Sequence, residues 1–323
     1  MTDKYYITTP IYYVNDKPHI GHAYTSVATD FIARFMRLNE YDVRFQTGTD
    51  EHGLKIQKAA ESKGKEPLEL CDENSQIFRD LTTTLDLSND DFIRTTEQRH
   101  IDGASFLWNR LHERNQIYLG EYTGWYSIND ETFYNEKDLV KQSDGSFKTV
   151  TGGPVDWITE KSYFFKLSEW SDKLLDIYKK NPDFISPKSK RNEVIKFVES
   201  GLNDLSVSRT SFNWGIKTPT DNDHIMYVWL DALTCYANGV KYLTDSKNEL
   251  SLYWNNVVHI VGKDILRHHA VYWPAFLLAA DLKLPNKIFA HGWWTNEGKK
   301  ISKSLGNVID PIEIINNYGL DQF

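Results

Sequence analysis

Cysteine is scarce in this chain, which holds only Cys71 and Cys235 among 323 residues. Two thiols are too few for a disulfide framework or a four-thiolate zinc site, so both are interpreted as buried apolar residues. An excess of basic residues is also lacking, because the net charge is -8 at pH 7. A protein that only coats nucleic acid is usually basic, so any contact with RNA must be local or supplied from elsewhere.

Long apolar runs are absent as well. No stretch approaches the roughly 20 apolar residues that span a bilayer. The first residues, MTDKYYITTPIYYV, fit neither a signal peptide nor a transit peptide. We therefore expect no membrane contact and a cytoplasmic location. The 40% of hydrophobic and 14% of aromatic residues are typical of a globular protein, and the length predicts a main domain with a second one inserted in it.

The chain begins with an alternation of strand and helix patterns. Residues 5–13 are β-branched and aromatic and predict a buried strand. A second strand is predicted over residues 42–48, followed by a helix from about Gly53. Between the two strands, from Gly21 onward, apolar residues recur at the spacing of a helix with one apolar face, namely Val27, Phe31, Ile32, Phe35 and Leu38. This order predicts a parallel α/β unit.

The pattern changes between residues 113 and 219. Short alternating runs, turn signals and mixed helices there predict a smaller α+β insertion. The α/β rhythm then resumes, with predicted elements at 224–238 (strand into helix), 257–262 (strand), 267–280 (helix interrupted by Pro274) and 287–291 (strand). The predicted fold class is therefore α/β, a parallel sheet split by an α+β insertion.

The tetrapeptide His19-Ile20-Gly21-His22 lies where the first strand passes into the first helix. Backbone N–H groups and the macrodipole favour phosphate at a helix N-terminus. Two imidazoles can add donors to phosphate oxygens, and Gly21 allows an adenine ring to approach the backbone. The alternative reading of this tetrapeptide alone is a pair of surface histidines beside a turn.

Near the other end of the chain, KKISKSLGN (residues 299–307) predicts a cationic loop. Attack on an α-phosphate builds negative charge on the phosphorus oxygens and on the departing pyrophosphate. Lysines carried by a loop can neutralise that charge as it develops. Taken alone, such a run is more often a solvated loop, and the prediction depends on its pairing with the first motif.

Three further places follow predicted strands. Asp50 ends the second strand, at the edge where ligands bind to parallel sheets, and can anchor a substrate ammonium; the alternative is a helix N-cap. Asp264 follows another strand and can accept ribose hydroxyls. The aromatic run Tyr227–Ala232 with Tyr236 can wall a pocket for an apolar, polarizable side chain, or it can be core.

Together these segments resemble the methionyl-tRNA synthetase family of class I aminoacyl-tRNA synthetases, over almost the whole chain. The first and last motifs correspond to the HIGH and KMSKS signatures of that class. The most specific stretches are ITTPIYYVNDKPHIGHAYT, QTGTDEHGLKIQ, GGPVDWITEKSYFFKLS, GLNDLSVSRTSFNWGI, YVWLDALTCY, GKDILRHHAVYWPAFL and KKISKSLGN. The resemblance implies a Rossmann-type catalytic domain (1–112 and 220–296) split by a connective-peptide insertion (113–219), with residues 297–323 holding the lysine loop and the start of a stem-contact segment.

The resemblance also implies an activity, in which methionine is activated with ATP to methionyl-adenylate and then transferred to tRNA. The substrates implied are methionine, ATP with Mg²⁺, and the acceptor end of tRNA. The implied catalytic residues are His19, His22, Lys300 and Lys303. The implied ATP-binding residues are Gly21, Gly262, Asp264, His291 and Lys303. The implied methionine-binding residues are Ile11, Tyr13, Asp50, Trp229, Ala232, Tyr236, Ile265 and His269.

Two departures from the family pattern bear on function. Many relatives carry zinc-binding cysteines in the insertion, whereas residues 126–134 here have none, so no metal site is predicted. The family also continues beyond Phe323 with an anticodon-binding domain, so this chain alone is expected to perform only the activation step. A basic set can still touch an acceptor stem or can be an ordinary solvated surface. Its members are Lys179, Lys180, Lys188, Lys190 and Arg191.

Two other functions remain open from the sequence. One is a different adenylyl-transferring enzyme that shares the histidine motif and uses no tRNA; methionine-dependent ATP–pyrophosphate exchange would exclude it. The other is not an enzyme, either an RNA-binding scaffold or an inactive fragment of a catalytic core. A degenerate scaffold should have lost His19, His22 or Lys303, and all three are present.

Overall fold

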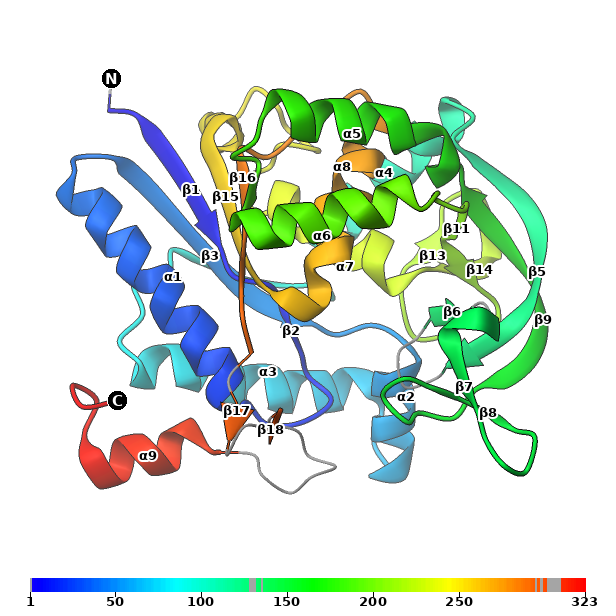
Figure 1. The fold of residues 1–323 in the computed structure, drawn as a ribbon. Coiled ribbons are helices and arrows are strands. Elements are labelled where there is room, and N and C mark those ends of the chain that lie inside the picture. Colours follow the sequence, from blue (N-terminus) through cyan, green and yellow to red (C-terminus); the bar gives the residue numbers. More distant parts are fainter. Residues whose placement is uncertain (1, 128–131, 135, 294, 297–298, 301–308) are drawn as a thin grey trace.

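The computed structural model describes residues 2–127, 132–134, 136–293, 295–296, 299–300 and 309–323 (Figure 1). Its main sheet has seven strands, and every pairing within it is parallel. The strand order is β10-β16-β15-β1-β3-β2, and β4 also pairs with β3. These strands are β1 (Lys4–Thr8), β2 (Tyr12–Tyr13), β3 (Asp42–Asp50), β4 (Asp91–Arg94), β10 (Ile185–Ser186), β15 (Val257–Gly262) and β16 (Lys287–His291).

The sheet has the doubly wound arrangement. From β1 the chain moves outward to β3 and β4 on one side, and later returns to place β15 and β16 on the other side. The strand order therefore reverses between β1 and β15. Ligands bind at the carboxyl ends of the strands at such a switch point. The predicted α/β fold class is confirmed.

The strand predicted over residues 5–13 is divided in the structure. Its two parts, β1 and β2, pair with successive segments of β3. Pro10 lies between them and has no backbone N–H to donate to a neighbouring strand. The prediction of β structure was right, and the prediction of one continuous strand was wrong.

Helices cover both faces of the sheet (Figure 1). Successive residues of a strand point to opposite faces. Accordingly Ile7 of β1 packs with Ala33 of α1, whereas Tyr6 belongs to the cluster that includes Trp108 of α4 and Leu230 of α7. The α-helices are α1 (Ile20–Leu38), α2 (Leu54–Ser62), α3 (Pro67–Thr84), α4 (Gln98–Glu113), α5 (Ser171–Lys180), α6 (Lys188–Glu199), α7 (Val228–Asn238), α8 (Trp273–Ala279) and α9 (Pro311–Tyr318).

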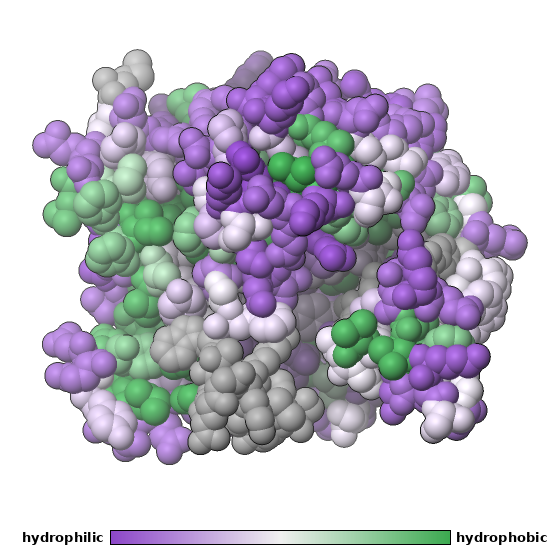
Figure 2. Space-filling view, viewed as in Figure 1, coloured by the Kyte–Doolittle hydropathy of each residue, from purple (hydrophilic) through white to green (hydrophobic). Residues whose placement is uncertain are grey.

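Helix α1 forms as predicted, but of the five residues predicted to face the core only Ile32 packs against it. Phe31 and Leu38 are 71% and 84% exposed, and Val27 and Phe35 are exposed too. Figure 2 shows the corresponding hydrophobic surface on the side of the molecule where α1 lies. The buried face of α1 consists of small or polar residues, including Ala23, Thr25, Ser26, Thr29, Asp30 and Ala33. These small side chains allow the helix to pack closely against the sheet.

The segment predicted as an insertion, residues 113–219, contains most of the antiparallel structure. One sheet has the order β11-β9-β5-β6, a second the order β12-β14-β13, and β7 pairs with β8. The strands are β5 (Ile117–Ser127), β6 (Thr132–Tyr134), β7 (Leu139–Lys141), β8 (Phe147–Thr149), β9 (Asp156–Phe165), β11 (Leu205–Ser206), β12 (Ser208–Arg209), β13 (Lys217–Thr218) and β14 (Asp221–Met226). The same segment also supplies β10 to the parallel sheet, so the domain boundaries stay a prediction.

The remaining elements are short. A π-helical turn at His268–Tyr272 runs directly into α8, whose first turn contains Pro274. The predicted helical segment is therefore present, but the predicted interruption at Pro274 is wrong, because the backbone stays helical through this residue and only the hydrogen-bonding pattern changes before it. The 3-10 helices are Glu136–Asp138, Leu167–Trp170, Glu249–Asn256 and Lys263–Ile265, and β17 (Thr295–Asn296) pairs with β18 (Lys299–Lys300). In the part of the chain that the structure describes, every helix is too short or too polar to cross a bilayer. A cytoplasmic location stays a prediction.

Candidate active site

A cavity of about 560 Å³ opens at the carboxyl ends of the parallel strands, next to the switch point. Most of its wall consists of residues that the sequence predicted for the site: Ile11, Tyr13, His19, Gly21, His22, Asp50, Trp229, Ala232, Tyr236, Gly262, Asp264, Ile265, His269 and His291. The structure therefore brings these residues together around one cavity. Their individual roles stay predictions.

The two histidines of the first motif form a capping box at the start of α1. The backbone N–H of Gly21 donates to Nδ1 of His19 over 3.1 Å, and the backbone N–H of His19 donates to Nδ1 of His22 over 3.0 Å. Because Nδ1 accepts in both rings, the proton of each neutral imidazole lies on Nε2. The rings stack with centroids 3.9 Å apart. The helix terminus thus fixes two imidazoles in the form that donates from Nε2.

Gly21 is required by this cap. A Cβ atom built at this position would lie 2.9 Å from the imidazole of His19, closer than real Cβ contacts allow. A larger residue would therefore push the His19 ring away from its backbone donor. The sequence argument for Gly21 was a close approach of adenine, and the structure adds this second constraint.

A second group of predicted residues lies at the ends of β15 and β16, where Gly262 pairs with His291. Nδ1 of His291 donates to the carbonyl oxygen of Gly292 over 2.8 Å, and its Nε2 is hydrogen-bonded to the hydroxyl group of Thr25 over 2.8 Å. The indole N–H of Trp293 donates to Asp264 over 3.2 Å. These bonds fix a planar ring and a carboxylate at the edge of the sheet.

The opposite end of the cavity is walled by aromatic rings. Trp229 stacks on His268 with ring centroids 3.7 Å apart. Nδ1 of His269 donates to the carbonyl oxygen of Ile265 over 2.9 Å, so the hydroxyl of Tyr236 donates to Nε2 of His269 over 2.6 Å. This end is lined by polarizable rings and fixed hydroxyl and imidazole groups, and Asp50, 6% exposed, lies in the same cavity wall.

Burial keeps the histidines at this end neutral. It lowers the pKa of His269 to about 4 and that of His268 to about 3, and holds the pKa of His259 well below its usual value of 6.5. As the pH falls from 6.5 toward 4, the unfolded chain takes up protons that the folded chain does not. Stability conferred by these neutral histidines is present above pH 6.5 and is lost on acidification.

We therefore expect the free energy of unfolding, measured by urea denaturation, to rise with pH through the window between 4 and 6.5. His269→Gln is the matched variant, because the glutamine carbonyl can still accept from Tyr236 but does not titrate. Its slope against pH should be shallower than that of the wild-type chain. Identical slopes for the two proteins would show that His269 does not contribute to the acid sensitivity.

Some predicted features fall outside the described residues or stay open. Lys303 lies outside them, and for Lys300 the structure describes only the backbone, which pairs with Thr295. The cysteine-free stretch 126–134 is only partly described. Among the described residues, no three or more His, Cys, Asp or Glu side chains gather as a metal site would require. The absence of zinc stays a prediction.

The basic set lies at the end of α5 and the start of α6, over which Figure 2 shows a mostly hydrophilic surface. Lys180 pairs with Asp176 over 2.8 Å, and Lys190 pairs with Glu193 over 2.6 Å. These pairings within single helices reduce the net positive field, which favours the reading of an ordinary solvated surface over that of an RNA contact.

Several residues that line the cavity were not predicted from the sequence. Tyr24 and Thr25 follow the histidine motif on α1, Lys55 lies on α2, Leu233 on α7, and Trp293 follows β16. A helical signal existed for one of them, since Thr25 lies four residues after Gly21 and three after His22, about one helical turn. Lys55 and Trp293 carried no local signal, because their place in the wall follows from how distant segments pack.

A doubly wound parallel sheet with this cavity at its switch point defines an α/β protein of the Rossmann type. Comparison with known families is more specific. The model of the class I tRNA synthetases (M) matches residues 5–144 and 144–323, and the chain belongs to this family.

Curated relatives with similar sequences support the same family. The methionine–tRNA ligase of Rickettsia conorii is 59% identical over 322 residues, which are 100% of this chain and 62% of that protein. That of Brucella melitensis is 53% identical over 320 residues, 99% of this chain and 62% of that protein. The chain thus spans about 62% of the length of these curated relatives.

Two solved structures of Mycobacterium tuberculosis methionyl-tRNA synthetase are also similar. The complex with methionyl-adenylate matches with a TM-score of 0.96 at 51% identity, covering 99% of this chain and 63% of that one. The free-state structure matches with a TM-score of 0.84 at 47% identity, covering 100% of this chain and 60% of that one.

Proposed function

We propose that this chain activates methionine with ATP, forming methionyl-adenylate and pyrophosphate. The observation that carries the proposal is that the predicted nucleotide and methionine residues described with their side chains line one cavity of about 560 Å³. That volume is in the range of small-molecule sites. The similarity to the adenylate-bound relative, which exceeds that to its free state, supports a cavity already arranged for that product.

In the proposed reaction a carboxylate oxygen of methionine attacks the α-phosphorus of ATP. The new bond is O–P, the bond between the α-phosphorus and the bridging oxygen breaks, and pyrophosphate leaves with that electron pair. No covalent bond to the enzyme forms, so positioning and charge stabilisation supply the catalysis. His19 and His22 would donate from Nε2 to phosphate oxygens, and Lys300 and Lys303 would neutralise the charge that develops. Mg²⁺ would accompany ATP as part of the substrate.

The two ends of the cavity would divide the substrates between them. Gly262, Asp264 and His291, at the ends of β15 and β16, would lie along the adenosine. The thioether of methionine would lie in the aromatic end, among Ile11, Tyr13, Trp229, Ala232, Tyr236, Ile265 and His269, and Asp50 would accept hydrogen bonds from the α-ammonium.

Transfer of the methionyl group to tRNA belongs to the proposal for the longer protein, since the chain spans about 62% of its relatives. In that step a ribose hydroxyl of the tRNA acceptor end would attack the activated carbonyl carbon and release AMP. The cavity of this chain would supply the methionyl-adenylate for that transfer.

The direct test is ATP–pyrophosphate exchange by this chain, with methionine, homocysteine and leucine compared. We expect exchange with methionine well above that with leucine. Discrimination against homocysteine should be smaller, because it lacks only the S-methyl group of methionine, and one such carbon in an apolar pocket contributes only about 1–3 kcal/mol. Methionine binding in calorimetry without exchange would support the pocket and contradict autonomous activation. If the chain showed neither exchange nor methionine binding, the proposed function would be contradicted.

A further inference from the structure

Beside the cavity, a carboxylate is buried between two histidines. The side chain of Asp231, on the first part of α7, is 0% exposed. Its Oδ2 accepts from Nδ1 of His52 over 2.7 Å, and its Oδ1 accepts from Nε2 of His100 over 2.6 Å. We propose that Asp231 is a positioning residue, which fixes α7 relative to the loop after β3 and thereby sets the width of the methionine end of the cavity. The inference rests on the proposed function.

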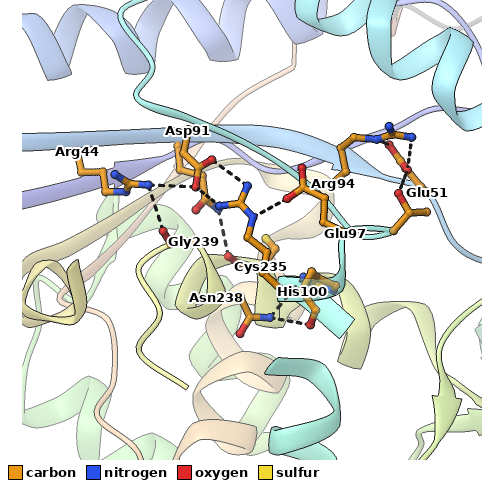
Figure 3. A network of polar contacts seen from close by, with 12 residues as sticks. Arg44, Glu51, Asp91, Arg94, Glu97, His100, Cys235, Asn238 and Gly239 are labelled. Atoms are coloured by element: carbon orange, nitrogen blue, oxygen red, sulfur yellow. Dashed lines mark hydrogen bonds and ion pairs between the residues drawn. The ribbon is translucent and has the colours of Figure 1, made fainter. Parts of the chain in front are cut away.

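The first arm of this cluster reaches the loop after β3, which directly follows Asp50, the last residue of that strand. His52 follows Asp50 by two residues and is itself buried, and its carbonyl oxygen accepts from the hydroxyl of Tyr13 over 2.7 Å. Between them, the buried Glu51 accepts from Arg94 of β4, over 2.7 and 3.0 Å (Figure 3). The loop is therefore held on one side by β4 and on the other side by Asp231.

The second arm reaches α4. His100 is 0% exposed, and the side-chain amide of Asn238, the last residue of α7, donates to its carbonyl oxygen over 3.1 Å (Figure 3). A Cβ atom at Gly103 of α4 would lie 1.7 Å from Oδ1 of Asn238, so the two helices touch at this point. Asp231 and Asn238, near the two ends of α7, thus both form hydrogen bonds with His100.

Charge explains why a carboxylate suits this position. Burial alone would raise the pKa of Asp231, but the two imidazoles outweigh burial and lower it to about 2. The ionised group offers acceptor oxygens to both N–H donors. An asparagine would have one acceptor oxygen, and its amide group would face the N–H of the other histidine. Removing the charge should therefore break the hydrogen bond to one of the two histidines. Such a loss is costly in a buried polar network.

Helix α7 explains why the arms matter for methionine. It carries Trp229, Ala232 and Tyr236 in the cavity wall, and the end of β3 carries Asp50 in the same wall. The side-chain end of methionine would contact the helix while its ammonium contacts the end of β3. Displacements of about 1 Å between groups that hold one substrate can change rates by roughly 10²-fold. The hydrogen bonds of these arms join α7 to α4 and to the loop after β3, whereas the adenosine end is built on β15 and β16.

The test is steady-state exchange with Asp231→Asn, with full titrations of both substrates. We expect the KM for methionine to rise roughly 10- to 100-fold and the KM for ATP to change less than about twofold. Asp30→Asn is the matched control, since Asp30 is also buried and accepts from Arg34 over 2.6 Å, on α1 and outside the cavity wall. It should lower the thermal midpoint without raising the KM for methionine.

Paired histidine variants keep the test decisive if Asp231→Asn does not fold. Asparagine at 52 and glutamine at 100 each retain an N–H donor at the position of the bonded imidazole nitrogen, whereas leucine removes it. His52→Asn and His100→Gln should keep a KM for methionine near that of the wild type, and His52→Leu and His100→Leu should raise it. Wild-type methionine KM values in Asp231→Asn, or in both leucine variants, would overturn the inference. An inactive wild-type chain would instead contradict the proposed function.

Discussion

His19→Asn is expected to lower the rate of methionine-dependent exchange roughly 10²–10³-fold while leaving the fold intact, the effect of losing one donor to developing charge. Asparagine is among the best N-cap residues, and its side-chain oxygen can accept from the backbone N–H of Gly21 as Nδ1 of His19 does. What it lacks is the Nε2–H donor. The variant thus separates the capping role of this histidine from its proposed contact with phosphate.

His19→Ala, which removes both roles, is the comparison. We expect a similar loss of exchange, together with a decrease in the free energy of unfolding of about 1 kcal/mol from the lost cap. Pre-steady-state formation of the adenylate and urea denaturation of both variants measure the two effects separately. Wild-type exchange by His19→Asn would show that His19 acts only as a helix cap.

The parallel sheet was predictable because strand patterns at residues 5–13, 42–48 and 257–262 alternate with helix patterns along the chain. Strand β10 was not, because its two residues, Ile185 and Ser186, are too few to show periodicity and pair with β16 about a hundred residues away. The buried face of α1 was misread for another reason. Polar residues on this face bond internally, as when Asp30 accepts from Arg34 and Thr29 donates to a backbone carbonyl, so burial does not require apolar side chains.

The cavity residues were predicted from short motifs, each made of residues that are adjacent in the sequence, and from the family resemblance that these motifs carry. Those motifs identify the ends of strands and helices, where a parallel sheet collects its ligand-binding groups. The Asp231 cluster was missed because its partners, His52 and His100, are 179 and 131 residues away along the chain. No local pattern distinguishes a buried aspartate from a surface one. Only the packing of α4, α7 and the loop after β3 reveals it.

The other large effect is expected at Asp50. Asp50→Asn keeps the shape of the side chain and removes its charge in a buried position. If the carboxylate binds the methionine ammonium, this change should weaken methionine binding by about 3 kcal/mol, within the range found when one partner of a buried charge pair is removed. At about 1.4 kcal/mol per factor of ten, the Kd from calorimetry should rise roughly 10²-fold.

A ligand that lacks the amino group makes this assignment specific. 4-(Methylthio)butanoate keeps the thioether and carboxylate of methionine, so it should bind the wild-type chain weakly and the Asp50→Asn variant equally weakly. This non-additivity is the signature of two groups in direct contact. Asp72→Asn is the matched control, since Asp72 is mostly exposed, pairs with Arg94 and is not part of the cavity wall. If Asp50→Asn weakened both ligands by the same factor, Asp50 would shape the pocket without contacting the ammonium, and the ammonium would need another acceptor.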